Sequence, residues 1–314
     1  MRILVTAIGS MSASRVISSL QMTGHYVVGT DIYPKEYHEE GYLCNSFVQV
    51  PFFNDPNYCA TLIDICRRYK CKVIIPLTDP EIDVINANRA MFEEKKIALY
   101  MQSSEVLDIA RNKLKIHEFF KDDNEVNTIN TYLLSDFHTY YIKRPWILKK
   151  IHGRSSVGVI VDPTINQLLT ILNMEDYVIQ PYLDGHIFTV DYIRDKKSGF
   201  DYSVAREELI RTSNGAGVTV KTIYDKTLAD MASFIGKKLD INGSINIEFI
   251  KHNDKYYLMD INPRFSGGID FSYKCSGYDF VLNHCRCFCS DELEPARKYE
   301  SKILIKSYEI KSGN

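Results

Sequence analysis

Apolar and polar residues alternate in blocks over the first hundred residues, and each block has the length of a strand or a helix. Short apolar runs rich in β-branched residues predict buried strands at 2–8, 26–32, 72–79 and 97–101. Apolar residues at helical spacing predict helices at 12–24, 58–70 and 81–96. Because strands that alternate with helices build parallel sheets, the pattern predicts an α/β domain with a doubly wound sheet over residues 1–103.

The pattern changes after this region. Residues 103–123 have the spacing of one or two helices, with Ser103 or Ser104 as the N-cap. Short apolar runs separated by Gly, Ser and Asp then predict strands at 146–151, 157–162, 177–183, 187–193, 201–207 and 218–222. The remaining predicted elements are a helix at 223–240, a hairpin at 245–262, a helix at 278–291 and a closing strand at 299–310. This order predicts an α+β region with antiparallel sheets.

The predicted hairpin carries charged and amide side chains where a strand pair should enter the core. A turn centred near Asp254 places Glu248 opposite Asp260. By the two-residue period of a strand, the same face also carries Asn246, Ile250 and Asn262. The opposite face is predicted to carry Phe249, Met259 and Ile261. Two facing carboxylates with an amide suit a hard cation such as Mg²⁺ that phosphate oxygens complete; a solvated hairpin face is the alternative.

The residues after the hairpin are suited to an anion. Arg264 offers a fork of donors that matches a phosphate group. The following Ser266, Gly267 and Gly268 provide backbone that can approach a ligand closely. We therefore expect a phosphate-binding site next to the cation site.

These pieces and their order resemble the ATP-grasp superfamily, in its carbamoyl-phosphate-synthetase-like branch of carboxylate–amine ligases. The resemblance runs from "ILVTAIG" near the N-terminus to "GYDFVLNHC", and its most specific part is "INIEFI…YYLMDINPR". It implies a Rossmann-like pre-ATP-grasp domain over 1–103, followed by an α+β ATP-grasp fold. The small lobe with its lead-in helices would span 104–180, and the large lobe with the metal site and the C-terminal strand would span 181–314. The implied metal ligands are Glu248, Asp260 (often Glu in the family) and Asn262.

The resemblance also implies a nucleotide site. Lys149 in "WILKKI" and Lys113 in "ARNKLKIHEFF" match two lysines of the family that contact the nucleotide. The loop "HGRSSVG" is similar to the loop that covers the phosphates, and "YVIQPYL" is similar to the hinge that holds the adenine. The further nucleotide-binding residues implied by these segments are Ser155, Ser156, Gly158, Gln180, Pro181, Tyr182 and Leu183.

The resemblance departs from the family at the ribose. The family usually has Glu at the position of Ile187, where it holds the ribose hydroxyls, and Asp184 or His186 are the substitutes that the sequence offers. Arg206 is implied as a contact to the transferred phosphate or acyl phosphate, together with Arg264. Arg211 is a secondary candidate, with surface exposure as its alternative.

The resemblance implies a ligase that uses ATP and Mg²⁺ (or Mn²⁺). A carboxylate would attack the γ-phosphate to give an acyl phosphate, and an amine (or a thiol) would then displace phosphate. Phosphorylation of carbamate or bicarbonate, as in carbamoyl phosphate synthesis, and a non-catalytic ATP-binding module are the alternatives. A dinucleotide-dependent oxidoreductase is disfavoured, because only Gly9 stands where three glycines are needed before Asp31.

Composition narrows the partners. The 314 residues include 38 Lys and Arg and 40 Asp and Glu, so the net charge of −2 gives no general attraction to nucleic acid or an anionic membrane. No run approaches the roughly 20 apolar residues of a membrane span. We expect a cytoplasmic protein with small carboxylate and amine substrates; the oligomeric state stays open, with a homodimer as one option. Its eight cysteines, including those of "HCRCFCSD", are expected to be structural thiols.

Overall fold

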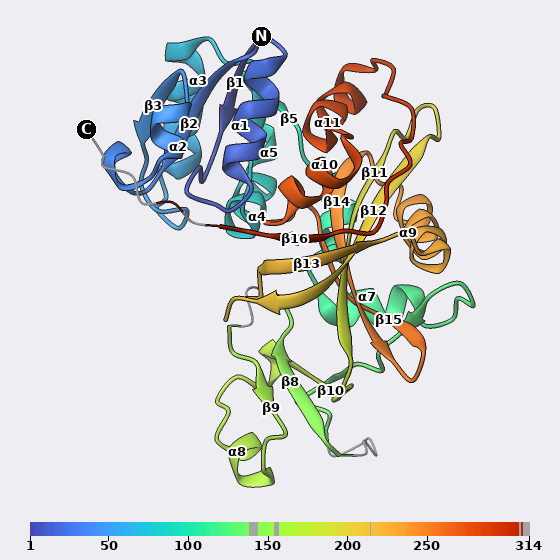
Figure 1. Cartoon of the computed structure of the whole chain (residues 1–314). Helices are drawn as coiled ribbons and strands as arrows, with labels where there is room; N and C mark the ends of the chain where they lie inside the picture. Colours follow the sequence, from blue (N-terminus) through green and yellow to red (C-terminus); the bar gives the residue numbers. More distant parts are fainter. Residues whose placement is uncertain (138–143, 154–156, 214, 308, 310–314) are drawn as a thin grey trace.

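The computed structural model describes residues 1–137, 144–153, 157–213, 215–307 and 309. It contains three sheets with their helices (Figure 1). The strands are β1 (Arg2–Val5), β2 (Tyr26–Asp31), β3 (Ser46–Gln49), β4 (Val73–Ile75), β5 (Ala98–Leu99), β6 (Asn127–Thr128), β7 (Tyr132–Leu133), β8 (Trp146–Lys150), β9 (Ile160–Val161), β10 (Tyr177–Pro181), β11 (His186–Arg194), β12 (Asp201–Arg211), β13 (Gly217–Ile223), β14 (Gly243–His252), β15 (Lys255–Asn262) and β16 (Ile303–Ile305). The α-helices are α1 (Ala13–Met22), α2 (Glu40–Leu43), α3 (Tyr58–Tyr69), α4 (Asp79–Ala87), α5 (Arg89–Glu94), α6 (Ser104–Ala110), α7 (Lys113–Phe120), α8 (Ile165–Leu169), α9 (Lys226–Lys238), α10 (Ile269–Ser276) and α11 (Phe280–Cys289). Two 3₁₀-helices are η1 (Lys35–Tyr37) and η3 (Met174–Asp176).

The first sheet has the strand order β3-β2-β1-β4-β5, and all of its pairings are parallel. This confirms the predicted α/β character of the N-terminal region. The sequence did not predict β3, whose residues are only partly buried at the sheet edge. A half-buried edge strand lacks the continuous apolar run by which central parallel strands are recognised.

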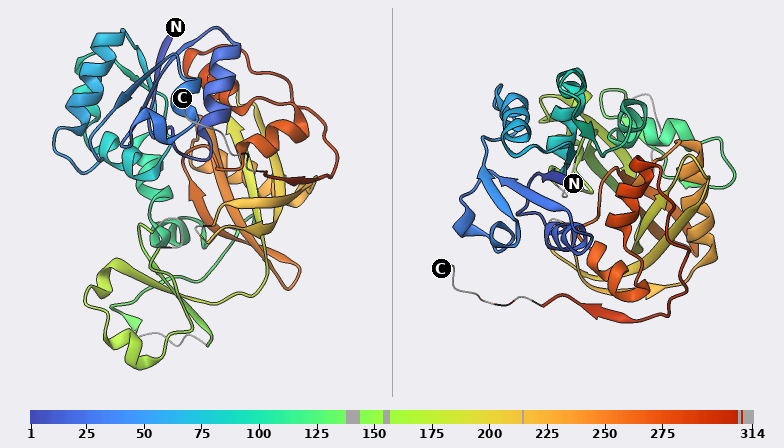
Figure 2. Two further views of the ribbon diagram at one scale, coloured as in Figure 1. Left: turned by 60° about the vertical axis from the view of Figure 1, so that its left-hand side comes forward. Right: turned by 90° about the horizontal axis from the view of Figure 1, so that it is seen from above.

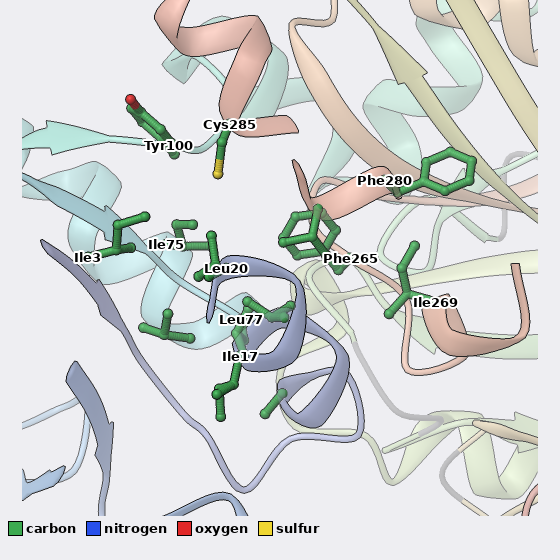
Figure 3. Close-up of a cluster of buried hydrophobic side chains, with 14 of the residues drawn as sticks. Ile3, Ile17, Leu20, Ile75, Leu77, Tyr100, Phe265, Ile269, Phe280 and Cys285 are labelled. Carbon is green, nitrogen blue, oxygen red and sulfur yellow. The ribbon is translucent and has the colours of Figure 1, made fainter. Parts of the chain in front are cut away.

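The first sheet shares its core with the C-terminal part of the chain. Ile3 on β1 and Ile17 on α1 belong to the same buried cluster as Phe265, Ile269 and Phe280 (Figure 3). Helices α1 and α11 are also in contact. The cluster therefore fixes the N-terminal region against the strand pair that carries the predicted metal ligands.

The four-stranded sheet, with order β7-β10-β8-β9, is antiparallel and stands apart from the other two (Figures 1 and 2). It has a small core of its own around Trp146 and Leu148, which Leu168 of α8 covers. A sheet with a separate core can change its orientation without disturbing the rest of the molecule. This is a suitable property for a segment that covers a ligand.

The seven-stranded sheet has the order β16-β13-β12-β11-β14-β15-β6. Helix α9 packs on one of its faces, and the side chains of Val106 on α6 and Ile116 on α7 join the same core. The Ser103 hydroxyl accepts a hydrogen bond from Val106 N, which confirms Ser103 as the N-cap. The lead-in helices thus pack on the large sheet, and the domain limits at 103 and 180 stay predictions.

The β14–β15 hairpin pairs Glu248 with Asp260, as predicted, but it needs a β-bulge to do so. Asn253 and Asp254 form the turn with φ of 48° and 58°, the left-handed values typical of a tight two-residue hairpin loop. The register from this turn pairs Phe249 with Leu258, so Met259 is the extra residue before Asp260. The prediction that Met259 faces away from the acids is wrong, because the bulge turns it into the cavity described below.

No helix in the described residues combines the length and the apolar character that a membrane span requires. The cysteine-rich helix α11 buries Cys285 and Cys287 and exposes Cys289. No cluster of three metal-binding His, Cys, Asp or Glu side chains occurs in that described part.

His284 in α11 gives the fold a dependence on pH. Its Nδ1 accepts from Ser244 N (2.8 Å), and its Nε2 lies 3.1 Å from the carbonyl oxygen of Tyr100, to which it donates. Burial lowers the pKa of the imidazole from 6.5 to about 4. The unfolded chain therefore binds the proton first as pH falls from 6.5 to 4, and the folded state loses stability across that window, by about 3 kcal/mol at most.

Urea unfolding at pH 7.5 and pH 5 tests this expectation. The wild-type protein should lose more unfolding free energy between the two pH values than His284→Gln does. An equal loss in both proteins would show that His284 does not carry this pH dependence.

Candidate active site

A cavity of about 840 Å³ is lined by residues from all three sheets. The seven-stranded sheet contributes the predicted metal ligands, and the four-stranded sheet contributes Lys149 and Lys150. The N-terminal region around the first sheet contributes the turn after β1, the end of β2 and the start of helix α4. A concave site where separate structural units meet is the usual place for a ligand.

Four polar side chains stand in one row across the large sheet. Arg206 on β12 pairs in register with Thr189 on β11, Thr189 with Glu248 on β14, and Glu248 with Asp260 on β15. All four line the cavity. The alternate residues Phe188 and Ala205 lie in the core on the α9 side. The two-residue period of the strands therefore concentrates the charged groups on the cavity face.

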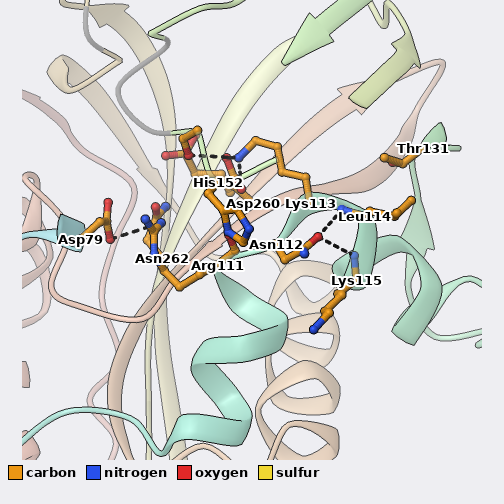
Figure 4. Close-up of polar contacts among 12 residues, drawn as sticks. Asp79, Arg111, Asn112, Lys113, Leu114, Lys115, Thr131, His152, Asp260 and Asn262 are labelled. Carbon is orange, nitrogen blue, oxygen red and sulfur yellow. Dashed lines mark hydrogen bonds and ion pairs between the residues drawn. The ribbon is translucent and has the colours of Figure 1, made fainter. Parts of the chain in front are cut away.

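Both predicted metal-binding carboxylates are paired with cations. Lys113 Nζ lies 2.8 and 2.9 Å from the two Asp260 oxygens (Figure 4), and Arg211 Nη2 lies 3.1 Å from Glu248 Oε2. The Asn262 amide nitrogen donates to Asn246 Oδ1 (3.1 Å). The structure brings all three predicted ligands to one wall of the cavity, and two carboxylates with an amide oxygen form a donor set that suits Mg²⁺.

Lys149 is a buried cation without a partner among the described residues. Its side chain is 9% exposed and lines the cavity. Burial lowers the pKa of its ammonium group to about 8, an effect that Asp260 opposes and Lys113 reinforces. A buried, unpaired lysine in a cavity is costly unless an anion binds there.

Arg264 connects the cavity to the N-terminal region. Its Nη2 lies 3.2 Å from Asp79 Oδ2, at the start of α4, and its Nη1 donates to Phe265 O (3.0 Å). Asp79 also lies 3.7 Å from Arg111. Arg111 in turn makes two 3.0 Å hydrogen bonds to Asp83. The sequence analysis did not identify Asp79 or Arg111 as site residues. The position of Asp79 at the end of a buried strand is the one feature of the sequence that indicates a role for it; Arg111 has no such feature.

Arg206, the predicted contact to the transferred phosphate, is almost completely buried and has several protein partners. Its guanidinium group, 2% exposed, lies 2.6 Å from Asp191 Oδ2 and 3.1 Å from Glu208 Oε1, and it also donates to Ser266 Oγ (3.1 Å). These contacts give Arg206 a structural role in the wall of the cavity that it lines. Its contact with a phosphate stays a prediction.

The predicted adenine hinge lies at the end of β10 and just after it. Gln180 is buried, and its Nε2 donates to Thr131 Oγ1 (2.8 Å), whereas no donor among the described residues reaches its Oε1. Pro181 pairs with Trp146, and Tyr182 N donates to Pro145 O (2.8 Å). Gln180, Pro181, Tyr182 and Leu183 are not among the described residues that line the large cavity.

His186, a predicted substitute for the ribose ligand missing at Ile187, is paired with an acid outside the large cavity. Its Nδ1 lies 2.6 Å from Glu207 Oε1, and both residues alternate with the cavity-facing positions of β11 and β12. Asp184 lines a separate open groove, together with Lys251. The sugar-binding role of either residue stays a prediction.

The phosphate-covering loop is only partly described. Ser155 and Ser156 lie outside the described residues. Gly158 has a φ of +76°, a left-handed conformation that favours glycine, and the position of a Cβ on it would lie 3.4 Å from Lys150 Cε. Gly153 O accepts from Lys113 Nζ at 3.4 Å. The described ends of the loop therefore adjoin the lysines of the cavity.

The Gly9 turn does not leave its amide available for a dinucleotide. Gly9 N donates to Asp31 Oδ2 (2.9 Å), so the glycine turn and the acid after β2 bind each other. This contact is a further argument against the oxidoreductase alternative.

The chain matches two family models. Residues 3–100 match the model "PylC-like, N-terminal domain", and residues 173–308 match "ATP-grasp in the biosynthetic pathway with Ter operon". The carbamoyl phosphate synthase large chain of Clostridium perfringens (strain SM101 / Type A) is 32% identical over 127 residues, which are 37% of this chain and 12% of that one. The arginine-specific large chain of Bacillus subtilis (strain 168) is 23% identical over 177 residues, which are 52% and 17% of the two chains. The aligned region therefore spans only a small part of these relatives.

Solved structures share the fold over nearly the whole chain. N5-carboxyaminoimidazole synthetase from Staphylococcus aureus, in complex with ADP, superposes with a TM-score of 0.77 at 16% identity, over 97% of this chain and 81% of that one. The biotin carboxylase domain of Hydrogenobacter thermophilus 2-oxoglutarate carboxylase, in complex with MgADP, ADP and bicarbonate, gives a TM-score of 0.77 at 15% identity, over 94% and 71%. At this level of identity the likeness shows the fold alone.

Proposed function

The chain belongs to the ATP-grasp superfamily, in its carbamoyl-phosphate-synthase-like branch, and from this premise we propose that it is an ATP-dependent ligase. The proposed reaction joins a small carboxylic acid to an amine through an acyl phosphate and releases ADP and phosphate. Two of the solved relatives are complexes with ADP, and one of these also contains magnesium, which supports Mg²⁺–ATP as the cofactor.

The observation that carries the proposal is that two carboxylates and a buried ammonium group line the same cavity. Glu248 and Asp260 face the cavity across the β14–β15 pair. The ammonium group of Lys149, which has no partner in the described part of the chain, lies close enough to be influenced by both. An ordinary surface hairpin does not need a buried lysine opposite its acids. A metal with phosphate groups would satisfy both signs of charge at once.

The nucleotide would be held by residues of two sheets. Glu248, Asp260 and Asn262 would hold Mg²⁺, which would neutralise part of the charge of the phosphate groups. Lys149 would contact the phosphates, and Lys113 would join it. The adenine amine would supply the donor that Gln180 Oε1 does not find among the residues that the structure describes.

The acid substrate would be activated on the side of Arg264. This arginine is held by Asp79 from the N-terminal region, and the Ser266–Gly268 backbone follows it along the cavity wall. Donors in these positions can stabilise the charge on an acyl phosphate and on its tetrahedral adduct with the amine. Positioning and charge neutralisation, rather than a covalent protein nucleophile, are what phosphoryl transfer requires.

A substrate panel tests the proposal. Purified protein with Mg²⁺ and ATP is offered carboxylic acids, each with and without amines, and ADP release is measured. We expect ADP release that requires both an acid and an amine. Release with bicarbonate alone would favour carboxyphosphate chemistry, and tight nucleotide binding without any release would favour a non-catalytic module.

Nucleotide affinity should fall as the pH rises past about 8. Only the protonated form of Lys149 attracts phosphate, and its pKa of about 8 means that most of it is neutral at pH 9. Binding above pH 8 must therefore take up a proton, and the affinity for ADP should be about tenfold weaker at pH 9 than at pH 7.

Calorimetric titration with ADP and Mg²⁺ at several pH values measures this effect. Lys149→Met should bind more weakly and lose the pH dependence, whereas Lys115→Met, which removes an exposed lysine of α7, should keep both properties of the wild type. A pH dependence that persists in Lys149→Met would refute the assignment.

A further inference from the structure

The carboxylates assigned to the metal already have cationic partners. Lys113 contacts both oxygens of Asp260 at 2.8 and 2.9 Å, and Arg211 contacts Glu248 at 3.1 Å. The Lys113 side chain is 9% exposed, so its ion pair is not a solvated surface contact. Any divalent cation that binds these acids must compete with both side chains.

The charges around the acids decide which ligand can compete. Lys149 lies near the same two carboxylates and lacks a partner among the described residues. A bare divalent cation would displace Lys113 and Arg211 from their anions and place three protein cations beside a further double positive charge. This arrangement is unfavourable in a partly buried site, because each displaced cation loses its counter-charge.

A polyphosphate removes this conflict. Its negative charges provide new partners for Lys113, Lys149 and Arg211 at the moment when the metal takes over Glu248 and Asp260. Lys113 Nζ already lies 3.4 Å from Gly153 O, beside the predicted phosphate-covering loop, so a short movement would suffice. Arg211 Nε is held by Gly215 O at 2.7 Å, which keeps its guanidinium group at the cavity wall.

We propose that Lys113 and Arg211 are specificity-determining residues that admit a divalent cation together with a polyphosphate and disfavour the bare cation. The inference rests on the proposed function, since it assumes the same metal and nucleotide site. Without ligand, the two cations hold the carboxylates in place. With ligand, they exchange their carboxylate partners for phosphate oxygens.

Mn²⁺ binding tests the inference without any turnover. Free Mn²⁺ is measured by electron paramagnetic resonance, with protein alone and with protein plus ADP. The wild type should bind Mn²⁺ weakly alone and much more tightly with ADP. Lys113→Met should bind bare Mn²⁺ about tenfold more tightly than the wild type and should gain less from ADP.

Lys115→Met is the matched control. Lys115 lies on the same helix, pairs with Asp108 at 2.6 Å and does not line the cavity. Its replacement therefore shows any general effect of losing one positive charge. It should bind Mn²⁺ like the wild type. Arg211→Met provides a second test at Glu248, should Lys113→Met fail to fold in a thermal-unfolding check.

The outcomes separate the inference from the proposed function. If bare Mn²⁺ binds no more tightly to Lys113→Met or Arg211→Met than to the wild type, while ADP still promotes Mn²⁺ binding, the inference is wrong and the nucleotide site stands. If ADP does not promote Mn²⁺ binding to the wild type, the proposed nucleotide site itself is wrong, and the inference fails with it.

Discussion

Replacing Glu248 by glutamine should lower ADP release about a hundredfold or more in any substrate pair that the wild-type protein turns over. The amide keeps the size of the side chain but removes the negative charge that a metal ligand needs. Glu248 stands in the cavity-facing row opposite Asp260, and its only other role in the described structure is the 3.1 Å contact with Arg211. Because the side chain is partly exposed, folding should tolerate the change.

Glu207→Gln is the matched control for this experiment. Glu207 lies on β12, which β11 separates from β14, and its side chain has a similar exposure to that of Glu248. It belongs to the face of the sheet that is turned away from the cavity. Rates are compared after thermal unfolding has shown that both variants are folded. Full activity in Glu248→Gln, or an equal loss in Glu207→Gln, would remove Glu248 from the metal site.

Replacing Asp191 by asparagine should destabilise the protein by about 3–5 kcal/mol. Asp191 is fully buried, and its Oδ2 accepts from Arg206 Nη1 at 2.6 Å and from Ser272 Oγ at 2.5 Å. The neutral variant leaves the buried guanidinium group with one acid, Glu208, in place of two. The loss is a large fraction of the stability of an ordinary domain.

An ion pair whose acid is half exposed, at the end of the same strand, provides the comparison. Arg194 at the end of β11 lies 3.3 Å from Asp240, which is half exposed. Asp240→Asn should cost less than about 1 kcal/mol, because Asp240 itself is half exposed to water and Arg194 Nη1 keeps its 2.9 Å hydrogen bond to the carbonyl oxygen of Ile241. Urea unfolding of both variants measures the difference; similar small losses would mean that the Asp191–Arg206 pair does not stabilise the fold.

The Asp191 prediction also bears on the site. Arg206 donates to Ser266, and a Cβ on Gly268 would lie only 2.8 Å from Arg206 Nη2. The buried pair therefore supports the glycine segment that follows Arg264. A moderate loss of ADP release in Asp191→Asn would be consistent with this support, and it should accompany the loss of stability.

The sequence by itself determined the order of the elements and the residue types of the site. Apolar runs and helical spacing were sufficient for the central strands, because each is buried between helices and reads as continuous apolar sequence. The two-residue period placed Glu248, Asp260 and Asn262 on one face, and the pairing of Glu248 with Asp260 is confirmed. These features depend on near neighbours in the chain, so a local pattern can carry them.

Only the tertiary structure decided how these residues are paired and how far they are buried. The bulge at Met259 corrects the register that the tight two-residue turn sets, so that Glu248 pairs with Asp260. No local sequence pattern predicts this bulge. The contacts Lys113–Asp260 and Arg264–Asp79 each join residues more than a hundred positions apart. Such contacts depend on how the separate sheets pack, for example through the buried cluster that Ile17 and Phe265 share. Burial can lower the pKa of Lys149 only after that packing has formed.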